Sequence, residues 1–308
     1  MPHHWNLDQV PDQSGRTVIV TGSNSGIGYQ AALALAKRKA RVVLACRNQE
    51  KAKAAVERIQ VEVPTASLVS LPLDLADLSS VAAFSDAFRS AHRQLDILIN
   101  NAGVMALPKR RTKDGFEMQF GTNHLGHFAL TGQLLDLLLA SPGSRVVNVS
   151  SMAHQFGRIR FHDLQWERRY SSWGAYGQSK LANLLFTHEL NRRLRQAGKN
   201  TISVACHPGW AATNLQETGP KMAGSKLMQG LSALGNVVLA QDAAAGALPT
   251  LFAAVEPLKG DEYVGPTSML GWRGSPEVVK PLRKARDSKV SKRLWEVSED
   301  LTGVRYAL

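Results

Sequence analysis

Short apolar stretches alternate with longer, helix-like stretches along most of the chain. The strand-like stretches are Thr17–Val20, Arg41–Cys46, Ser67–Leu71, Asp96–Asn100, Arg145–Val149 and Thr201–Cys206, with a last strand expected around Glu262–Val264. The helix-like stretches are Ile27–Lys39, Lys51–Gln60, Phe116–Leu139, Ala175–Arg195 and Gln241–Val255. Strands that read as continuous apolar runs between helices are typical of a parallel sheet buried on both faces. The pattern predicts an α/β protein: a single-domain Rossmann fold whose doubly wound parallel sheet has about seven strands and helices on both faces.

No internal repeat or low-complexity linker divides residues 1–308, so we expect one domain. A segment at about 210–238 contains several glycines and follows the carboxyl end of a predicted strand, where ligands bind in such sheets. We expect it to form a lid over the substrate, and a surface loop with one amphipathic helix is the alternative. Residues from about 257 to 308 form a C-terminal extension.

The cysteines and the N-terminal residues indicate in which cellular compartment the protein is expected. Cys46 and Cys206 both lie in apolar, strand-like runs, which favours buried free thiols in a reducing cytoplasm. The first fifteen residues are polar and resemble no signal peptide. No run of about 18 uncharged apolar residues occurs, so we expect no membrane span. Peripheral contact with a membrane stays open.

The chain carries a formal net charge of +12 at pH 7, which raises the question of nucleic-acid binding. The basic residues are scattered in small groups such as Lys109–Arg111 and Arg168–Arg169, without interleaved aromatic residues. This distribution favours solvated basic faces, and we expect no nucleic-acid partner. Attraction to an anionic cofactor, substrate or membrane surface remains an alternative.

A glycine-rich turn joins the first predicted strand to the first predicted helix. Its sequence is Thr21-Gly22-Ser23-Asn24-Ser25-Gly26-Ile27-Gly28. Glycines allow the backbone to turn tightly and to approach a pyrophosphate, whose negative charge suits a helix N-terminus. Because the turn lies between a strand and a helix near the start of the chain, it predicts a dinucleotide-binding site.

The residue after the second strand predicts which dinucleotide binds. NAD-binding proteins place an acidic residue there to bind the ribose hydroxyls, but this chain has Arg47. A guanidinium can pair with the 2′-phosphate of NADP(H) through charge-assisted hydrogen bonds. The sequence therefore favours NADP(H) over NAD(H), and an exposed arginine that begins a helix is the alternative.

Tyr176 and Lys180 are spaced i, i+4 on a predicted helix, so their side chains share one face. A free tyrosine has a pKa of about 10 and is a poor base at neutral pH. A nearby ammonium favours the phenolate and lowers this pKa. The pair therefore predicts a tyrosine that acts as general acid or base on an alkoxide or alcohol.

Polar and small residues follow three further strands. Ser150 and Ser151 follow the fifth strand, and either hydroxyl could hold a substrate oxygen against Tyr176. Asn100-Asn101-Ala102-Gly103 ends the fourth strand, where small residues would let the backbone pass close to a cofactor. Pro208-Gly209 follows the sixth strand.

In this order, these motifs resemble the short-chain dehydrogenase/reductase family, and the resemblance covers nearly the whole chain. It implies that Ser151 rather than Ser150 is catalytic, and that Asn123 helps to hold a water linking Lys180 to solvent. It further implies that Asp74 and Leu75 meet the adenine. Pro208, Gly209 and Thr213 would close over the nicotinamide amide.

Three longer stretches narrow the resemblance to one branch. Asp114–Thr131, Asn148–Phe161 and Ala175–Leu190 are similar to retinol dehydrogenases, protochlorophyllide reductases and WW-domain-containing oxidoreductases. The chain shows neither an N-terminal membrane anchor nor a WW domain, so the resemblance is taken to imply a lipophilic carbonyl or alcohol rather than a retinoid in particular. We expect an apolar pocket, although each candidate could equally belong to the core. The candidates are Met105, Met152, Phe156, Trp210 and Gly224–Leu239.

The sequence thus predicts an NADP(H)-dependent oxidoreductase that transfers hydride between the nicotinamide and a carbonyl or alcohol, with Tyr176 moving the proton. The alternative is a non-catalytic NADP(H)-binding redox sensor or scaffold. No metal is expected, since His124 and His127 have no third ligand and are more typical of a core or a polar network. The apolar faces of Phe116–Leu139 and Ala175–Arg195 allow a homodimer or homotetramer, or packing on the sheet of a monomer.

Overall fold

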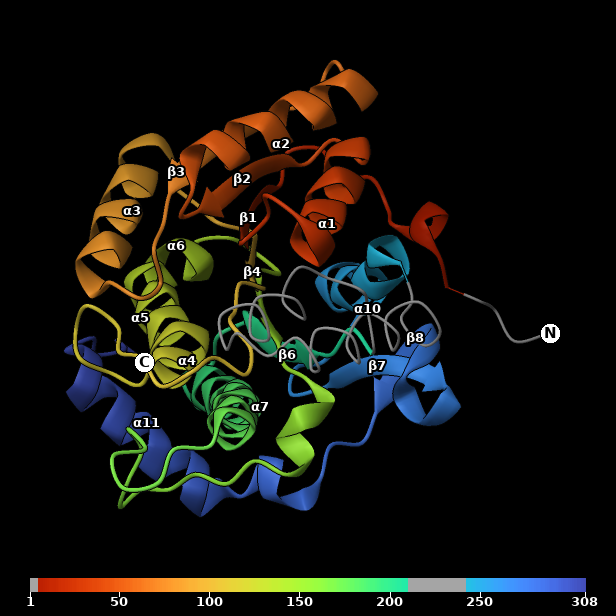
Figure 1. Ribbon diagram of the computed structural model, residues 1–308. Coiled ribbons are helices and arrows are strands. Elements are labelled where there is room, and N and C mark those ends of the chain that lie inside the picture. Colours follow the sequence, from red (N-terminus) through yellow and green to blue (C-terminus); the bar gives the residue numbers. More distant parts are fainter. Residues whose placement is uncertain (1–4, 210–241) are drawn as a thin grey trace.

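One eight-stranded β-sheet organises the chain (Figure 1). The computed structural model describes residues 5–209 and 242–308, without the side chain of Leu270. The strands are β1 (Thr17–Thr21), β2 (Arg41–Cys46), β3 (Leu68–Pro72), β4 (Ile97–Asn100), β5 (Arg145–Val149), β6 (Ile202–Cys206), β7 (Tyr263–Ser268) and β8 (Arg273–Val279). Their order is β3-β2-β1-β4-β5-β6-β7-β8, and every neighbouring pair is parallel except β7 and β8. The predicted Rossmann fold is confirmed, with an antiparallel edge strand added to it.

Helices cover both faces of the sheet. The helices are α1 (Gly26–Lys37), α2 (Gln49–Glu62), α3 (Leu78–Ala91), α4 (Met118–Phe120), α5 (Gly126–Gln133), α6 (Leu135–Leu139), α7 (Ser172–Gln196), α10 (Ala243–Val255) and α11 (Ser288–Thr302). Short turns of 3-10 helix are η1 (Leu7–Gln9), η3 (Met152–Gln155), η4 (Met269–Gly271) and η5 (Arg283–Arg286). Helices α1, α2 and α10 contribute to the core on one face, whereas α3, α5 and α7 contribute to the core on the other (Figure 1).

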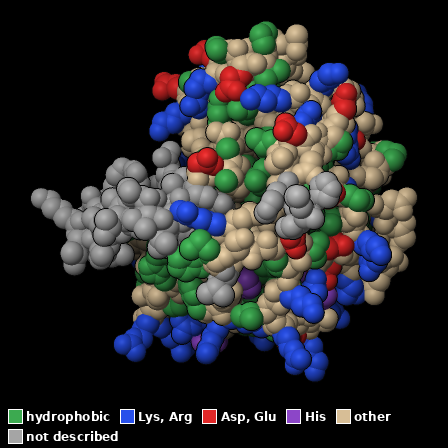
Figure 2. All heavy atoms as spheres, turned by 90° about the vertical axis from the view of Figure 1, so that its right-hand side faces the viewer, with side chains coloured by type: hydrophobic (Ala, Val, Ile, Leu, Met, Phe, Trp, Pro, Cys, Tyr) green, Lys and Arg blue, Asp and Glu red, His purple; other side chains and the backbone are tan. Residues whose placement is uncertain are grey.

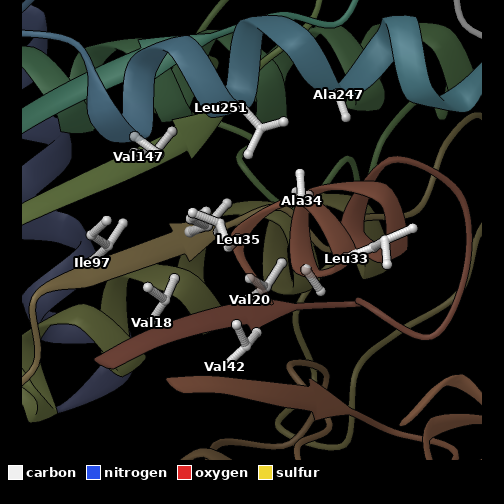
Figure 3. Packing of buried hydrophobic residues seen from close by; sticks show 14 of the residues in the cluster. Val18, Val20, Leu33, Ala34, Leu35, Val42, Ile97, Val147, Ala247 and Leu251 are labelled. Carbon is white, nitrogen blue, oxygen red and sulfur yellow. The ribbon is translucent and has the colours of Figure 1, made fainter. Parts of the chain in front are cut away.

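Successive residues of the central strand supply these two cores. Val18 and Val20 lie on the face covered by α1 and α10, near Leu35 and Leu251 (Figure 3). Ile19 belongs to the cluster on the opposite face. Side chains alternate across a strand, so a strand buried on both sides needs apolar residues at every position. This explains the continuous apolar run that predicted β1.

The stretch expected as one long helix, Phe116–Leu139, is instead interrupted. After α4, the backbone widens into the π-helix η2 (Gly121–Leu125) before α5 begins. At Leu134 the backbone leaves helical geometry, and α6 follows. A π-helical turn inserts an extra residue into an α-helix and shifts the side chains that follow it. Here the inserted turn contains Asn123.

Residues after 257 contribute β7, β8, η5 and α11. Helix α11 packs along α7, where the Trp295 ring stacks on Phe186 with centroids 5.9 Å apart. The Arg193 guanidinium lies 4.5 Å from the centroid of the Trp295 ring. Part of the α7 surface is therefore covered by the same chain. The expected lid, with Trp210 and Thr213, lies outside the described residues.

The face of the molecule drawn in Figure 2 differs in charge between its upper part and its lower edge. Figure 2 shows Lys and Arg side chains mixed with Asp and Glu on its upper part. More Lys and Arg side chains occur along its lower edge, at the height of η5 and α11 in Figure 1. Among the helices within residues 5–209 and 242–308, none is long and apolar enough to cross a membrane.

Candidate active site

The predicted motifs gather at one edge of the sheet. The parallel strands β1, β2, β4 and β5 all end there, so the residues that follow them become neighbours. Because β1 lies between β2 and β4, the glycine-rich turn comes to lie beside the residues that follow β4. The order of the strands thus brings together segments that are far apart in the sequence.

The side chain of Thr21 joins the ends of β1 and β4. Its hydroxyl oxygen accepts hydrogen bonds from the backbone N–H groups of Asn101 and Ala102, both at 2.9 Å. In return, the Asn101 amide donates to the Thr21 carbonyl at 2.8 Å. These three bonds fix the residues after β4 against the start of the glycine-rich turn.

Two glycines are required by this close approach. Gly22 has a φ of +66°, and a Cβ there would lie 2.9 Å from the Cβ of Ala102. A Cβ at Gly28 would lie 2.5 Å from the Asn101 amide nitrogen. Ser25 is the N-cap residue of α1, and its side chain forms no capping hydrogen bond. The Ser25 hydroxyl therefore leaves the first backbone N–H groups of α1 available. A backbone cradle with free helix N–H groups suits a pyrophosphate, and the residues present therefore fit a dinucleotide.

The other residues of the turn have local roles. The Ser23 hydroxyl donates to the Val20 carbonyl at 2.9 Å, so its proton is used within the turn. The Asn24 carbonyl accepts from Arg58 at 3.2 Å. Gly26 and Ile27 are the first residues of α1. The backbone, rather than the Ser23 side chain, is the part of this turn suited to an anion.

Arg47 and Asp74 follow β2 and β3 on the same edge. Arg47 is exposed, and within the described part of the chain no carboxylate forms an ion pair with it. Asp74 accepts a hydrogen bond from the Ala76 N–H at 3.0 Å, and Leu75 is buried. Both predicted segments therefore lie on the same side of the glycine-rich turn, because the strands run in the order β3-β2-β1. Arg47 follows β2, the neighbour of β1, and Asp74 follows β3, one strand further away.

Pro208 and Gly209 follow β6 and end the described segment. The Gly209 N–H donates to Nδ1 of His207 at 3.3 Å. A Cβ at Gly209 would collide with the Trp272 carbonyl, which holds this turn against the residues before β8. The turn therefore lies at the same edge of the sheet as the other predicted segments.

The four predicted catalytic residues come from three elements. Tyr176 and Lys180 lie on α7, Ser151 follows β5, and Asn123 lies in η2. The Lys180 Nζ atom lies 5.8 Å from the centroid of the Tyr176 ring. A Cβ on Gly103 would lie 3.1 Å from Asn123 Oδ1 and 3.5 Å from Lys180 Nζ. Gly103 thus brings the strand end of the cradle next to the two polar side chains.

Asn123 is buried and all of its side-chain groups are bonded. Its Oδ1 accepts from the Val104 N–H at 2.8 Å, and its Nδ2 donates to the Val104 carbonyl at 2.9 Å. The same Nδ2 donates to the Ser179 hydroxyl at 2.9 Å. Ser179 in turn donates to the Tyr176 carbonyl at 2.8 Å. Asn123 therefore connects the residues after β4 to the first turns of α7.

The two serines after β5 have different partners. The Ser150 hydroxyl donates to the Lys180 carbonyl at 2.8 Å and serves to hold β5 against α7. The Ser151 side chain caps η3 by accepting from the Ala153 N–H at 3.2 Å, and its hydroxyl acts on the Tyr176 phenol to lower the pKa of that group. Of the two hydroxyls, only that of Ser151 is placed at the tyrosine.

The electrostatics differ from the sequence-based expectation of an acidic tyrosine. Burial raises the pKa of Tyr176 to about 12, and the hydrogen bond with Ser151 acts in the opposite direction. Burial also lowers the pKa of Lys180 to about 8. The Lys180 ammonium donates to the Val149 carbonyl at 3.0 Å, so its hydrogen bond stabilises β5 and not the phenolate. Tyr176 accordingly keeps its proton at neutral pH.

Two aromatic side chains lie near Tyr176: Trp173, which was not predicted, and Phe156, which was among the predicted pocket candidates. The Trp173 ring meets the Tyr176 ring edge-on with centroids 6.1 Å apart. Phe156 lies beside Gly177, the next residue on α7. Both aromatic side chains are exposed, Trp173 at 43% and Phe156 at 54%. Trp173 lies three positions before Tyr176 on one helix, a spacing that could have identified it.

The two histidines of η2 and α5 have separate environments. His124 bonds to Ser298 at 2.9 Å, and His127 bonds to Thr21 at 2.9 Å. Within the described residues, no group of three or more His, Cys, Asp or Glu side chains could hold a metal ion. The interpretation of this pair as core and polar-network residues agrees with these contacts.

Comparison with known proteins identifies the class to which this fold and site belong. Residues 16–223 match the model of the short chain dehydrogenase family. The chain therefore belongs to this family of NAD(P)-dependent oxidoreductases. Within the family it belongs to the retinol dehydrogenase branch. The resemblance seen in the sequence motifs is thereby confirmed.

Individual relatives cover nearly the whole chain. Retinol dehydrogenase 12 of Homo sapiens is 44% identical over 296 residues, covering 95% of this chain and 88% of the relative. Retinol dehydrogenase 13 of Homo sapiens is 45% identical over 294 residues, covering 94% and 85% respectively. The crystal structure of an uncharacterised protein from Mycobacterium paratuberculosis is 43% identical, with a TM-score of 0.82 over 99% of this chain and 100% of that one.

Proposed function

We propose that the protein is an NADP(H)-dependent enzyme that interconverts a carbonyl group and an alcohol, with Tyr176 as general acid and base. The observation that carries this proposal is the position of a buried Tyr176, which lies on the same helix face as Lys180, with the Lys180 Nζ atom 5.8 Å from the centroid of its ring. The cradle formed by Gly22, Gly28 and the residues after β4 lies at the same edge of the sheet.

The chemistry divides between the cofactor and the side chains. When bound, NADP(H) supplies or accepts the hydride. Tyr176 gives its phenolic proton to the substrate oxygen during reduction and takes it back during oxidation. Ser151 donates a hydrogen bond to the same oxygen. Lys180, with a pKa of about 8, is mostly protonated at neutral pH and favours the phenolate left after the proton has moved.

The environment of Tyr176 suits its phenol to act as a general acid. A phenol with a pKa raised to about 12 holds its proton at neutral pH and is ready to donate it to a carbonyl oxygen. Oxidation would first require the phenolate, which burial disfavours. Ser151 limits this penalty but does not remove it, since the net shift of the tyrosine pKa is upward.

Arg47 supports the choice of NADP(H). It is exposed at the end of β2, next to the glycine-rich turn in strand order, and its guanidinium is not paired with a carboxylate among the described residues. A free guanidinium at this position suits a 2′-phosphate, whereas an acidic residue would suit an unmodified ribose.

The substrate class follows from the surroundings of Tyr176 and from the relatives. Exposed Trp173 and Phe156 lie close to Tyr176 and offer apolar surface. The curated relatives are named for retinol, a lipophilic alcohol. We therefore propose a lipophilic carbonyl or alcohol as substrate, with Met105 and Met152 as further candidates for its binding surface.

For the cellular compartment, the partners and the oligomeric state, we propose what the sequence predicts. The buried free thiols of Cys46 and Cys206 support a reducing cytoplasm. The scattered basic groups along the sequence support the absence of a nucleic-acid partner. A homodimer or homotetramer through α5 and α7 stays a prediction, which analytical ultracentrifugation tests.

The proposal is tested by measuring oxidation of NADPH and NADH with aliphatic, aromatic, steroid and retinoid aldehydes and ketones. We expect turnover with NADPH, and we expect Tyr176→Phe to lower kcat by about 10²- to 10⁴-fold. Tyr170→Phe is the matched control, since Tyr170 is also a partly buried tyrosine but bonds to the Leu107 carbonyl. Tight NADPH binding without turnover of any carbonyl would favour a redox sensor or scaffold.

A further inference from the structure

His127 joins the cofactor cradle to the active-site asparagine. Its Nε2 lies 2.9 Å from the Thr21 hydroxyl, and its Nδ1 lies 3.0 Å from the Asn123 carbonyl oxygen. The side chain is buried, so water does not compete for either bond. One imidazole thus spans the distance between the end of β1 and the π-helix η2.

The hydrogens in this cluster can be assigned from the partners. The Asn123 carbonyl can only accept, so Nδ1 of His127 must carry the hydrogen of that bond. In a neutral ring, Nε2 is then an acceptor and receives the hydrogen of the Thr21 hydroxyl. The Thr21 oxygen accepts in turn from the N–H groups of Asn101 and Ala102. Every donor and acceptor is matched in this arrangement.

The opposite tautomer fits less well. A hydrogen on Nε2 would leave Nδ1 as a lone pair facing the lone pairs of the Asn123 carbonyl oxygen at 3.0 Å. The Thr21 hydroxyl would then have to donate to the Ile99 carbonyl, which is 3.4 Å away. Burial lowers the pKa of His127 to about 4, with a further lowering by the charge of Lys180, so the ring is neutral near pH 7.

The network continues from both ends of His127 into the functional site. On one side, Thr21 holds the backbone that follows β4. On the other side, Asn123 bonds to Val104 and to Ser179, and Ser179 bonds to the Tyr176 carbonyl. A continuous set of hydrogen bonds therefore links the cradle to the helix that carries Tyr176.

We propose that His127, as a neutral Nδ1–H imidazole, is a positioning residue that sets the cofactor cradle and Asn123 in register with each other. The expected effect on kcat rests on the proposed function. The tautomer of His127 and its hydrogen bonds do not depend on that function. His127 does not touch the reacting atoms. It acts through Thr21 on the cradle and through Asn123 on the Tyr176 helix.

A natural control lies one helical turn away. His124 is also buried, lies in η2 and packs between the rings of Phe120 and Phe128. Its hydrogen bond goes to Ser298 on α11, away from the cradle. Substitution of His124 therefore removes a buried histidine from the same region without touching the proposed network.

The experiment compares two conservative substitutions that each keep one end of the link. His127→Gln can accept from Thr21 but loses the donor to Asn123, whereas His127→Asn keeps a donor near Asn123 but cannot reach Thr21. We expect His127→Gln to bind NADPH as the unmodified protein does and to lose roughly 10- to 100-fold in kcat. We expect His127→Asn to keep most of its kcat and to bind NADPH roughly 10-fold more weakly.

The controls separate positioning from general stability. His124→Gln and His124→Phe should lower the melting temperature but leave kcat and the NADPH dissociation constant nearly unchanged. A separate measurement on the protein alone uses ¹⁵N NMR of the histidine rings, with the His127 signals assigned from their loss in His127→Gln. We expect the Nδ1–H tautomer.

Two results would overturn the proposal: an Nε2–H tautomer, or equal losses in affinity and kcat for both His127 variants with similar losses in the His124 variants. If the unmodified protein binds NADPH but reduces no carbonyl, the proposed function fails separately. The tautomer and the difference in NADPH affinity between the two His127 variants then still decide whether His127 positions the cradle.

Discussion

Lys180 donates its hydrogen bond to the carbonyl oxygen of Val149, at a distance of 3.0 Å, across the junction between α7 and β5. The Asn183 amide donates to the same oxygen at 3.2 Å. The buried ammonium is therefore held by a backbone dipole, and no carboxylate of residues 5–209 or 242–308 forms an ion pair with it, which agrees with its lowered pKa of about 8. Such an arrangement keeps a cation next to the Tyr176 ring at the expense of stability.

We expect Lys180→Met to stabilise the protein near pH 7 while abolishing most activity. The unfolded lysine takes up its proton near pH 10.5 and the folded one near pH 8, so the unfolded state binds more protons between these values. The stability of the unmodified protein thus falls as the pH drops from 10.5 to 8 and stays lower below pH 8. Urea unfolding should show a gain on the order of 2 kcal/mol at pH 7, after allowance for the lost hydrogen bond.

The same experiment at pH 10.5 supplies its control. There the folded lysine is neutral and the unfolded lysine is about half protonated, so most of the advantage of the methionine variant should disappear or reverse. Asn183 still satisfies the Val149 carbonyl in the variant, which limits the penalty for losing the ammonium. A methionine variant that is less stable at pH 7 than at pH 10.5, relative to the unmodified protein, would contradict the assigned direction of the Lys180 pKa.

Ser150→Ala and Ser151→Ala should separate stability from catalysis. Ser150 donates to the Lys180 carbonyl within the core, so its loss should lower the free energy of unfolding by about 1 kcal/mol and leave most of kcat. Ser151 should show the opposite pattern, with a decrease in kcat of roughly 10²-fold from the loss of a hydrogen bond to the reacting oxygen. Urea unfolding measures the effect on stability, and steady-state kinetics measure the effect on kcat. A larger decrease in kcat for Ser150→Ala than for Ser151→Ala would indicate that Ser150, and not Ser151, is the catalytic serine.

Arg47→Ala should weaken the binding of NADPH roughly 10- to 100-fold and leave that of NADH nearly unchanged, because it removes charge-assisted hydrogen bonds to a 2′-phosphate. Fluorescence titration gives both dissociation constants. Arg41→Ala is the matched control, since Arg41 is an exposed arginine at the opposite end of the same strand. Equal effects of the two substitutions would indicate general electrostatic attraction rather than a specific contact.

Gly28→Ala should prevent dinucleotide binding. The added methyl would lie 2.5 Å from the Asn101 amide and 2.7 Å from the Gly22 carbonyl, so the turn and the residues after β4 would have to separate. Gly143→Ala serves as the comparison, because its Cβ would meet no atom within 4 Å although its φ of +68° makes the substitution strained. We expect that variant to lose about 1 kcal/mol of stability and to bind NADPH normally.

The sequence predicted the sheet and the location of the site because both depend on local patterns. The apolar runs of β2 and β5 match the observed strands, and the motifs at the strand ends meet because parallel strands end at one edge. Edge strand β8 was missed because its sequence contains Gly274, Pro276 and the exposed Glu277 rather than an apolar run. Proline is tolerated at a sheet edge, where one side of the strand has no partner.

The pKa values of Tyr176 and Lys180 depend on contacts with distant parts of the chain, which the spacing of the two residues in the sequence does not reveal. The i, i+4 spacing placed Lys180 beside Tyr176 and led to the expectation of a lowered tyrosine pKa. The structure shows that the ammonium bonds to Val149, 31 residues away, and that burial dominates the tyrosine. Likewise, the π-helix that contains Asn123 lies inside an apolar stretch that the sequence pattern represents as one regular helix.

The hydrogen bonds between Thr21 and Asn101 have a consequence for the newly synthesised chain. Synthesis proceeds from the N-terminus, so the glycine-rich turn leaves the ribosome long before the segment that completes it. The turn reaches its final form only when the strand carrying Asn101 has paired with β1, and the proton-transfer groups follow later still. A nascent chain therefore gains no stabilisation from the dinucleotide until β4 has been translated and has paired with β1. Binding of the dinucleotide then stabilises only those chains in which these two strands have paired, so the cofactor couples its own binding to the assembly of the sheet.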